Sequence, residues 1–251
     1  MNNRKKLEED FVKTLNNHYY NDLNINLQKF ITFVFNYFNH KSKIYCEKLT
    51  SKQKADFLIK IDNTVKYVSL KSGSQNSVHS EKIETFISFL LDVGINESII
   101  NILLLYHYGD DTLTGNGKTR YSANESKLRY KNKIFKFNKF INYSTILKKI
   151  VERFLLVGAK ETNKYVDVIY YGDIEIGTWC SSKELLEFCI YHKSMYINTP
   201  HFSVLTYQNW CRNITFSKKS ESHRNYIQIK WFSILSDIRK IRQINDSKID
   251  S

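Results

Sequence analysis

An aspartate and a lysine stand at the ends of two short apolar segments that have the composition of neighbouring β-strands. Asp56 enters the first segment, residues 55–61, and Lys71 leaves the second, residues 65–71. Side chains alternate between the two faces of a strand, so Ser69 and Lys71 are expected on the same side. A carboxylate can hold a divalent ion against a phosphate, and a lysine can steady the attacking water or the developing charge. The spacing therefore favours metal-assisted hydrolysis of a phosphodiester bond.

These residues resemble the PD-(D/E)xK nuclease superfamily, which includes many type II restriction endonucleases. The matching segments are KADFLIKI, where Asp56 takes the place of the metal-binding aspartate, and YVSLKSG, where Lys71 is the motif lysine. Glu8 or Glu9 takes the place of an acid that some members carry on their first helix. The resemblance covers roughly residues 5–108. It implies an endonuclease that cuts double-stranded DNA with Mg²⁺, for which Mn²⁺ may substitute.

Ser69 departs from this pattern, because the family places Glu or Asp two residues before the lysine. A hydroxyl is neutral and binds Mg²⁺ weakly compared with a carboxylate. Some members with Ser-x-Lys carry the missing carboxylate on the following helix. Glu84 lies thirteen positions after Lys71, and Glu81 lies ten after it. The resemblance therefore implies Asp56 and Glu84 as metal ligands, with Glu81 as the next candidate.

Each of these residues also has a simpler interpretation. Asp56 can solvate a strand end, and Lys71 can be an ordinary exposed lysine. Glu81 and Glu84 can be acids that stabilise the first turn of a helix through its dipole. Loss of the acid at position 69 would also fit a DNA-binding protein that no longer cuts, and the same chemistry would serve RNA, single strands or branched DNA.

The charge of the chain favours a polyanionic partner. Its 251 residues carry a formal net charge of +13, and residues 118–149 alone contain ten Lys or Arg and one acid, Glu125. Residues 212–242 contain eight Lys or Arg and two acids. Base composition of the genome can enrich lysine, but it does not by itself explain this clustering, which is typical of a surface that contacts phosphates.

Several side chains are candidates for contact with DNA. The loop that follows Lys71 is polar and contains His79, a secondary candidate for proton transfer. Amide and basic side chains further along pair well with base edges or phosphates. The candidates are Gln75, Asn76, Lys118, Arg120, Gln208, Asn209, Arg212, Asn213, Arg224 and Lys230.

The order of predicted elements indicates a mixed α/β fold. We expect helices in the first forty residues, strands joined at Asp62 and Asn63, a helix with Ser80 as its N-cap and Gly94 as its stop, and an interior strand in IINILLLYHY at 99–108. Residues 118–149 are expected to form a loop and then a helix from about Tyr143. A hairpin at 165–179, turning at Gly172 and Asp173, and further helices follow.

The predicted architecture is therefore a restriction-endonuclease-like α/β core, with a central mixed β-sheet flanked by helices, plus a C-terminal α+β portion. We assign residues 1–160 to a catalytic nuclease core and 161–251 to a lobe for DNA recognition or dimerisation. An enzyme of this type that cuts both strands is expected to act as a homodimer.

Other classes of protein fit the sequence poorly. TLTGNGKT has Thr112 where a phosphate-binding P-loop needs glycine. The four cysteines have neither zinc-site spacing nor the density of a disulfide scaffold. The longest apolar run, IINILLLY, is too short to span a bilayer. We expect a cytoplasmic protein with no membrane association.

Overall fold

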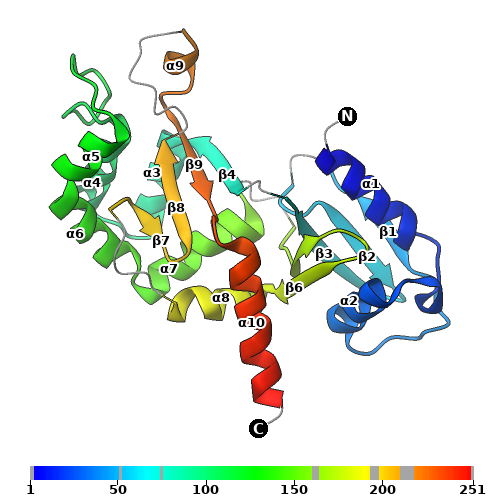
Figure 1. Cartoon of the computed structure of the whole chain (residues 1–251). Helices are drawn as coiled ribbons and strands as arrows, with labels where there is room; N and C mark the ends of the chain where they lie inside the picture. The colour runs from blue at the N-terminus through cyan, green and yellow to red at the C-terminus, as the bar shows by residue number, and fades with distance from the viewer. Residues whose placement is uncertain are drawn as a thin grey trace. The chain divides into compact units, whose positions relative to one another are not determined.

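The computed structural model describes residues 3–50, 53–73, 76–159, 164–192, 198–209 and 218–249. The chain divides into two compact units that alternate along the sequence (Figure 1). Unit 1 consists of residues 1–75, 155–188 and 233–251, and unit 2 of residues 76–154 and 189–232. The chain therefore passes between the two units several times.

Unit 1 is built on a mixed sheet, whose described strands run in the order β1-β2-β3-β5-β6. β2 (Phe57–Ile61) and β3 (Thr64–Lys71) form the predicted antiparallel pair, and Asp62 takes a positive φ of 53° in the turn between them. β1 (Tyr45–Lys48) pairs with β2, and β3 pairs in parallel with β5 (Val168–Gly172). β5 and β6 (Gly177–Ser181) form the predicted hairpin.

Helices cover the apolar face of this sheet. α1 (Asn3–Leu15) and α2 (Ile25–Phe35) contribute to one buried core with the strands, so the predicted N-terminal helices are confirmed. Phe11 stacks on Phe57 of β2, with 5.4 Å between ring centroids, and Phe30 packs edge-on against Tyr170 of β5. The C-terminal helix α10 (Ile234–Ile249) packs along β6. The short 3₁₀ helix η1 (Tyr20–Asp22) precedes α2.

Unit 2 has its own antiparallel sheet, in the order β4-β9-β8-β7. Its strands are β4 (Ser77–Lys82), β7 (His201–Phe202), β8 (Leu205–Asn209) and β9 (Tyr226–Lys230). The described helices are α3 (Ile83–Asp92), α4 (Glu97–Tyr108), α5 (Ala123–Arg129), α6 (Lys131–Ile141), α7 (Ser144–Val151) and α9 (Lys218–Ser222). The π-helical turn η2 (Glu152–Val157) and helix α8 (Ser182–Tyr191) each continue from one unit into the other. Phe86, Phe154 and Phe202 form the centre of the aromatic core of unit 2.

Three predictions about elements of unit 2 are wrong. IINILLLYHY belongs to helix α4, because the Asn96 side chain accepts from the backbone N–H of Ile99 and Gly109 closes the helix in the left-handed conformation. The run is apolar on most sides because the helix is largely buried, and periodicity cannot separate that case from a strand. Ser80 is a strand residue rather than an N-cap, since β4 extends to Lys82. Helix formation begins at Ala123, well before Tyr143.

Within the described parts of the chain, no helix combines the length and apolar character needed to cross a membrane.

Candidate active site

Asp56, Ser69 and Lys71 meet at one end of the unit 1 sheet. The Asp56 backbone N–H donates to the Val68 carbonyl at 2.8 Å, which continues the β2–β3 ladder by one residue and places Asp56 beside Ser69. The Lys71 Nζ donates to the Ser69 Oγ at 2.8 Å and lies 3.9 Å from Asp56 Oδ2. The alternation of β3 thus brings together the three residues that the sequence singled out.

The carboxylate of Asp56 is fixed by the main chain as well as by side chains. The Leu70 backbone N–H donates to Asp56 Oδ2 at 2.6 Å, and the Ser69 hydroxyl donates to the same oxygen at 3.4 Å. The side chains of Asp56 and Lys71 are each about 10% exposed, and Ser69 is fully buried. Opposite charges held in a poorly solvated place interact more strongly than they would in water. The carboxylate and the ammonium group are therefore held close together in a poorly solvated place.

The oxygen donors at this end of the sheet suit Mg²⁺ better than softer metals. They are the Asp56 carboxylate, the Ser69 hydroxyl and the Leu70 carbonyl, which accepts from Lys71 Nζ at 3.3 Å. The described residues contain no cluster of three or more His, Cys, Asp or Glu side chains with metal-binding geometry. Mg²⁺ keeps several waters and is commonly held by one or two carboxylates together with substrate phosphates. The oxygen atoms of unit 1 are of the type that Mg²⁺ prefers, with Asp56 as the one carboxylate among them.

An acid of the first helix also lies near this end of the sheet. Glu8 of α1 forms an ion pair with Lys48 of β1 at 2.9 Å, and Glu9 lies 3.8 Å from the same ammonium group. Lys48 is opposite Phe57, the residue after Asp56, in the β1–β2 register. Glu8 is only about 9% exposed, so the pair is partly shielded from water.

Glu81 and His79 lie in unit 2 on β4. Arg153 of η2 forms a two-pronged contact with Glu81, with N–O distances of 3.1 and 2.5 Å, and His79 Nε2 lies 3.4 Å from the same carboxylate. Burial raises the pKa of Glu81, but hydrogen bonds from His79 and Arg153 outweigh burial and lower it below its ordinary value. Glu81 is therefore a buried, ionised partner of Arg153.

Glu84 lies in the first turn of α3, also in unit 2, and is exposed. Its negative charge contributes to the raised pKa of Tyr108, after the larger effect of burial. Of the two candidate replacements for the missing acid, Glu84 is therefore exposed to solvent, whereas the carboxylate of Glu81 is already paired with Arg153.

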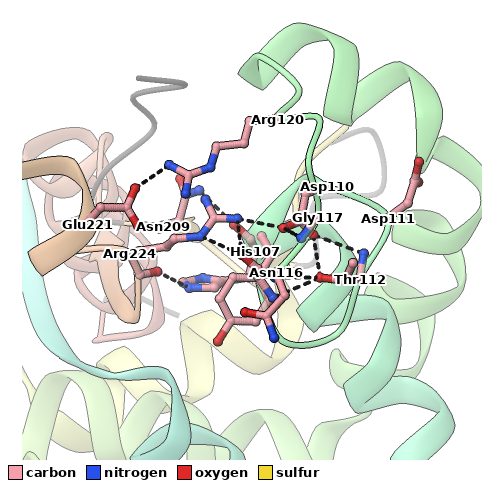
Figure 2. A network of polar contacts seen from close by, with 12 residues as sticks. His107, Asp110, Asp111, Thr112, Asn116, Gly117, Arg120, Asn209, Glu221 and Arg224 are labelled. Carbon is pink, nitrogen blue, oxygen red and sulfur yellow. Dashed lines mark hydrogen bonds and ion pairs between the residues drawn. The ribbon is translucent and has the colours of Figure 1, made fainter. Parts of the chain in front are cut away.

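Three of the predicted DNA-contacting side chains take part in a polar network inside unit 2 (Figure 2). Arg224 donates to Asp110, the Asn209 amide donates to the His107 carbonyl at 2.8 Å, and Arg120 pairs with Glu221 at 2.5 Å. Lys118 is exposed on the loop after α4. Asn76, Gln208 and Lys230 are half-buried, the last two within β8 and β9. Gln75, Arg212 and Asn213 lie outside the described residues.

The sequence did not identify two ion-pair partners: Asp110, which pairs with Arg224, and Arg153, which pairs with Glu81. The adjacent acids Asp110 and Asp111, directly after the apolar run that forms α4, were the available signal for the first. Arg153 has no local signal, because its partner Glu81 is 72 positions away.

His107 sits at the centre of the network and is almost fully buried. Its Nε2 lies 2.8 Å from the Arg224 carbonyl and therefore carries the proton, while Nδ1 accepts from the Tyr207 hydroxyl at 2.7 Å. Burial lowers the pKa of His107 from 6.5 to about 4; the hydrogen bond to the Arg224 carbonyl opposes this, and the Arg224 charge adds the smallest lowering contribution. The neutral imidazole thus forms hydrogen bonds with both the Arg224 carbonyl and the Tyr207 hydroxyl.

We expect this histidine to make stability depend on pH. The unfolded chain protonates His107 near pH 6.5 and the folded chain only near pH 4, so its contribution is present above pH 6.5 and is lost as the pH falls toward 4. The loss is about 3 kcal/mol across that window. Urea denaturation of wild type and His107→Gln at several pH values measures it; equal pH slopes for the two proteins would contradict the assignment.

Known proteins resemble this chain in fold rather than in sequence. No protein-family model matches this sequence, and no curated protein matches it. The crystal structure of the restriction endonuclease MspI in complex with its cognate DNA is similar to it, with a TM-score of 0.60 over 90% of this chain and 88% of that chain. The chain has the restriction-endonuclease fold. The sequence identity is 10%, so the likeness concerns the fold alone.

This fold agrees with the mixed α/β architecture predicted from the sequence, including the central sheet flanked by helices. In the restriction-endonuclease fold of this chain, the sheet of unit 1 carries Asp56, Ser69 and Lys71 at one end, on β3 and just before β2.

Proposed function

We propose that this protein is a Mg²⁺-dependent endonuclease that hydrolyses phosphodiester bonds of double-stranded DNA, as type II restriction enzymes do. The observation that carries the proposal is the convergence of Asp56, Ser69 and Lys71 at one end of the sheet in a restriction-endonuclease fold. Two further observations support DNA as the substrate. The MspI structure contains cognate DNA, and unit 2 carries eighteen Lys or Arg against nine Asp or Glu.

The side chains of unit 1 have distinct roles in this proposal. Asp56, held by the Leu70 N–H, would bind Mg²⁺. The proposed second carboxylate is Glu84, with Glu81 as the next candidate. When bound, Mg²⁺ would polarise the scissile phosphate and favour ionisation of the attacking water. Lys71, oriented by the Ser69 hydroxyl, orients the attacking water and stabilises the charge that develops on the phosphate. Ser69 positions Lys71 and is a weak metal ligand at most.

Cleavage of a long unmethylated duplex with Mg²⁺ tests the proposal, with Asp56→Asn as the inactive comparison. Discrete fragments from wild type, and none from Asp56→Asn at equal folding, are the expected result, because the amide removes the charge that binds the metal. Glu84→Gln and Glu81→Gln in the same assay identify the second carboxylate. The variant that loses cutting and recovers part of it in Mn²⁺ is the ligand.

The neutral Ser69 favours one other function, a DNA-binding protein of the same fold that does not cut. In that case wild-type protein shifts duplex DNA on a gel but leaves it intact with Mg²⁺ and with Mn²⁺. Fragments from RNA, single-stranded or branched substrates, with the duplex intact, would instead assign the chemistry to another nucleic acid.

We propose a homodimer for cleavage of both strands, since two-fold symmetry presents one active site to each strand. Sedimentation of the protein with and without a duplex containing the cut site checks this assembly.

A further inference from the structure

The loop at residues 110–120, between α4 and α5, is cross-linked by hydrogen bonds to a buried carboxylate. The Asp110 side chain is fully buried and accepts four hydrogen bonds (Figure 2). The donors are the backbone N–H and hydroxyl of Thr112, at 3.0 and 2.8 Å, the Gly117 N–H at 3.0 Å, and Arg224 at 2.7 Å. Asp110 therefore ties the two arms of the loop to each other and to Arg224, two residues before β9.

Arg224 and Thr112 extend this attachment over the tip of the loop. Arg224 also donates to the Gly115 carbonyl, at 3.3 Å from Nε and 3.0 Å from a terminal nitrogen, and lies over the Tyr108 ring at 5.5 Å. The Thr112 hydroxyl accepts from the N–H groups of Gly115 and Asn116, at 2.9 and 3.2 Å. The side chains of Thr112 and Arg224 thus form hydrogen bonds with the backbone at the tip of the loop.

The neighbouring acid, Asp111, ties the loop to the basic helices. It forms a two-pronged ion pair with Arg129 of α5, at 2.7 and 2.6 Å, and accepts from the Tyr130 and Tyr121 hydroxyls at 2.9 and 2.6 Å. Hydrogen bonds from Arg129 are the main reason that the pKa of Asp111 is far below its usual range. The two adjacent acids therefore attach the loop to two different elements of unit 2.

Two glycines permit this close packing. A Cβ on Gly117 would lie 2.3 Å from the Asp110 carbonyl oxygen, and one on Gly115, where φ is +79°, would lie 2.6 Å from the Tyr108 ring. These are the glycines of the TLTGNGKT segment, and the structure gives them a packing role in place of phosphate binding.

Stability of the core does not account for this arrangement. Leu113 is the one large apolar side chain among residues 110–120, all of which the structure describes, and it is 39% exposed. A buried ion pair contributes little net stability compared with apolar packing. Fixing a loop in advance does, however, lower the entropy cost of binding to its exposed side chains.

The exposed side chains of the loop indicate the partner. Thr114, Asn116, Lys118 and Thr119 all face solvent, and α6 continues with exposed lysines at 131, 133, 136 and 139. Amides pair with adenine edges, threonine with several base edges, and lysine with guanine or phosphate. We infer that residues 110–120 form a preorganised loop that reads duplex DNA, and that the Asp110–Arg224 pair positions it. The inference rests on the proposed function.

Binding measurements on the full chain test this inference. The probes are fluorescent duplexes with and without the sequence that wild type selects, titrated over a range of salt concentrations. Lys118→Ala is expected to weaken binding to both duplexes and to reduce the salt slope by about 1. Asn116→Ala is expected to reduce the preference for the selected sequence by about tenfold or more. Lys29→Ala and Asn21→Ala, exposed residues of unit 1, are the matched controls.

Asp110→Asn and Arg224→Lys test the positioning role. The first keeps the size of the side chain and the second keeps its charge. Both are expected to lose sequence preference as Asn116→Ala does, whereas a merely structural role would lower the melting temperature and leave the preference of the folded protein unchanged. Unchanged preference and salt slope in all loop variants, with wild type still binding and cutting duplex DNA, would overturn the loop inference alone. Wild type that neither binds nor cuts duplex DNA would overturn the proposed function, and the loop inference with it.

Discussion

Lys71→Met is expected to slow DNA cleavage by about 10²–10³-fold or more, because it removes a preorganised positive group from the place where charge develops. Methionine keeps the length of the side chain while losing the ammonium that contacts Ser69 and Asp56. Asp56 keeps its bond from the Leu70 N–H, so the proposed metal ligand stays in position. The expected defect is therefore in the rate of cutting, with DNA affinity within a few-fold of wild type.

Single-turnover cleavage, with the protein in excess over DNA, measures this rate apart from product release. Lys66→Met is the matched control, since Lys66 is on the same strand in a half-exposed pair with Asp167. We expect Lys66→Met to cut at the wild-type rate. A Lys71→Met protein that melts normally and still cuts within tenfold of wild type would remove Lys71 from the chemistry.

Arg153→Met is expected to reduce the free energy of unfolding by about 3–5 kcal/mol, because it leaves a buried carboxylate without its charged partner. The side chains of Glu81 and Arg153 are 6% and 12% exposed, and Arg153 also lies over the Phe89 ring at 4.5 Å. The double variant Glu81→Gln/Arg153→Met is expected to recover much of the loss, since it removes both charges together. Urea titrations of wild type, both single variants and the double variant give the coupling energy.

The exposed pair between Arg129 and Asp111 is the comparison for this cycle. Its side chains are 50% and 42% exposed, so breaking it with Arg129→Met is expected to cost at most about 1 kcal/mol.

The variants of Glu81 and Arg153 also distinguish two roles of Glu81. A Glu81→Gln protein of wild-type stability that no longer cuts would make Glu81 a metal ligand, and a less stable protein that still cuts would make it a structural residue.

Local patterns in the sequence were sufficient to predict the strands that carry the site. Alternation along β3 placed Ser69 and Lys71 on one side, and the turn at Asp62 brought Asp56 next to them, because a hairpin is determined by residues close in sequence. The restriction-endonuclease fold followed from the resemblance of the same short segments.

Contacts between distant segments could not be predicted in this way. The parallel pairing of Val68 with Val168 joins strands 100 positions apart, and the helical state of α4 depends on its burial. The partners of Arg120, Asn209 and Arg224 were equally hidden, since a basic or amide side chain has the same local appearance whether it binds DNA or a neighbouring carboxylate. Only the folded chain distinguishes the two cases.

The bond from the Leu70 N–H to Asp56 is made by the main chain and does not depend on the identity of the side chain at position 70. Every residue except proline supplies the same backbone donor. A comparison of side-chain identities does not register such a contact, whereas a comparison of backbones does. This agrees with a chain that matches no family model and is similar to a solved structure over 90% of its length.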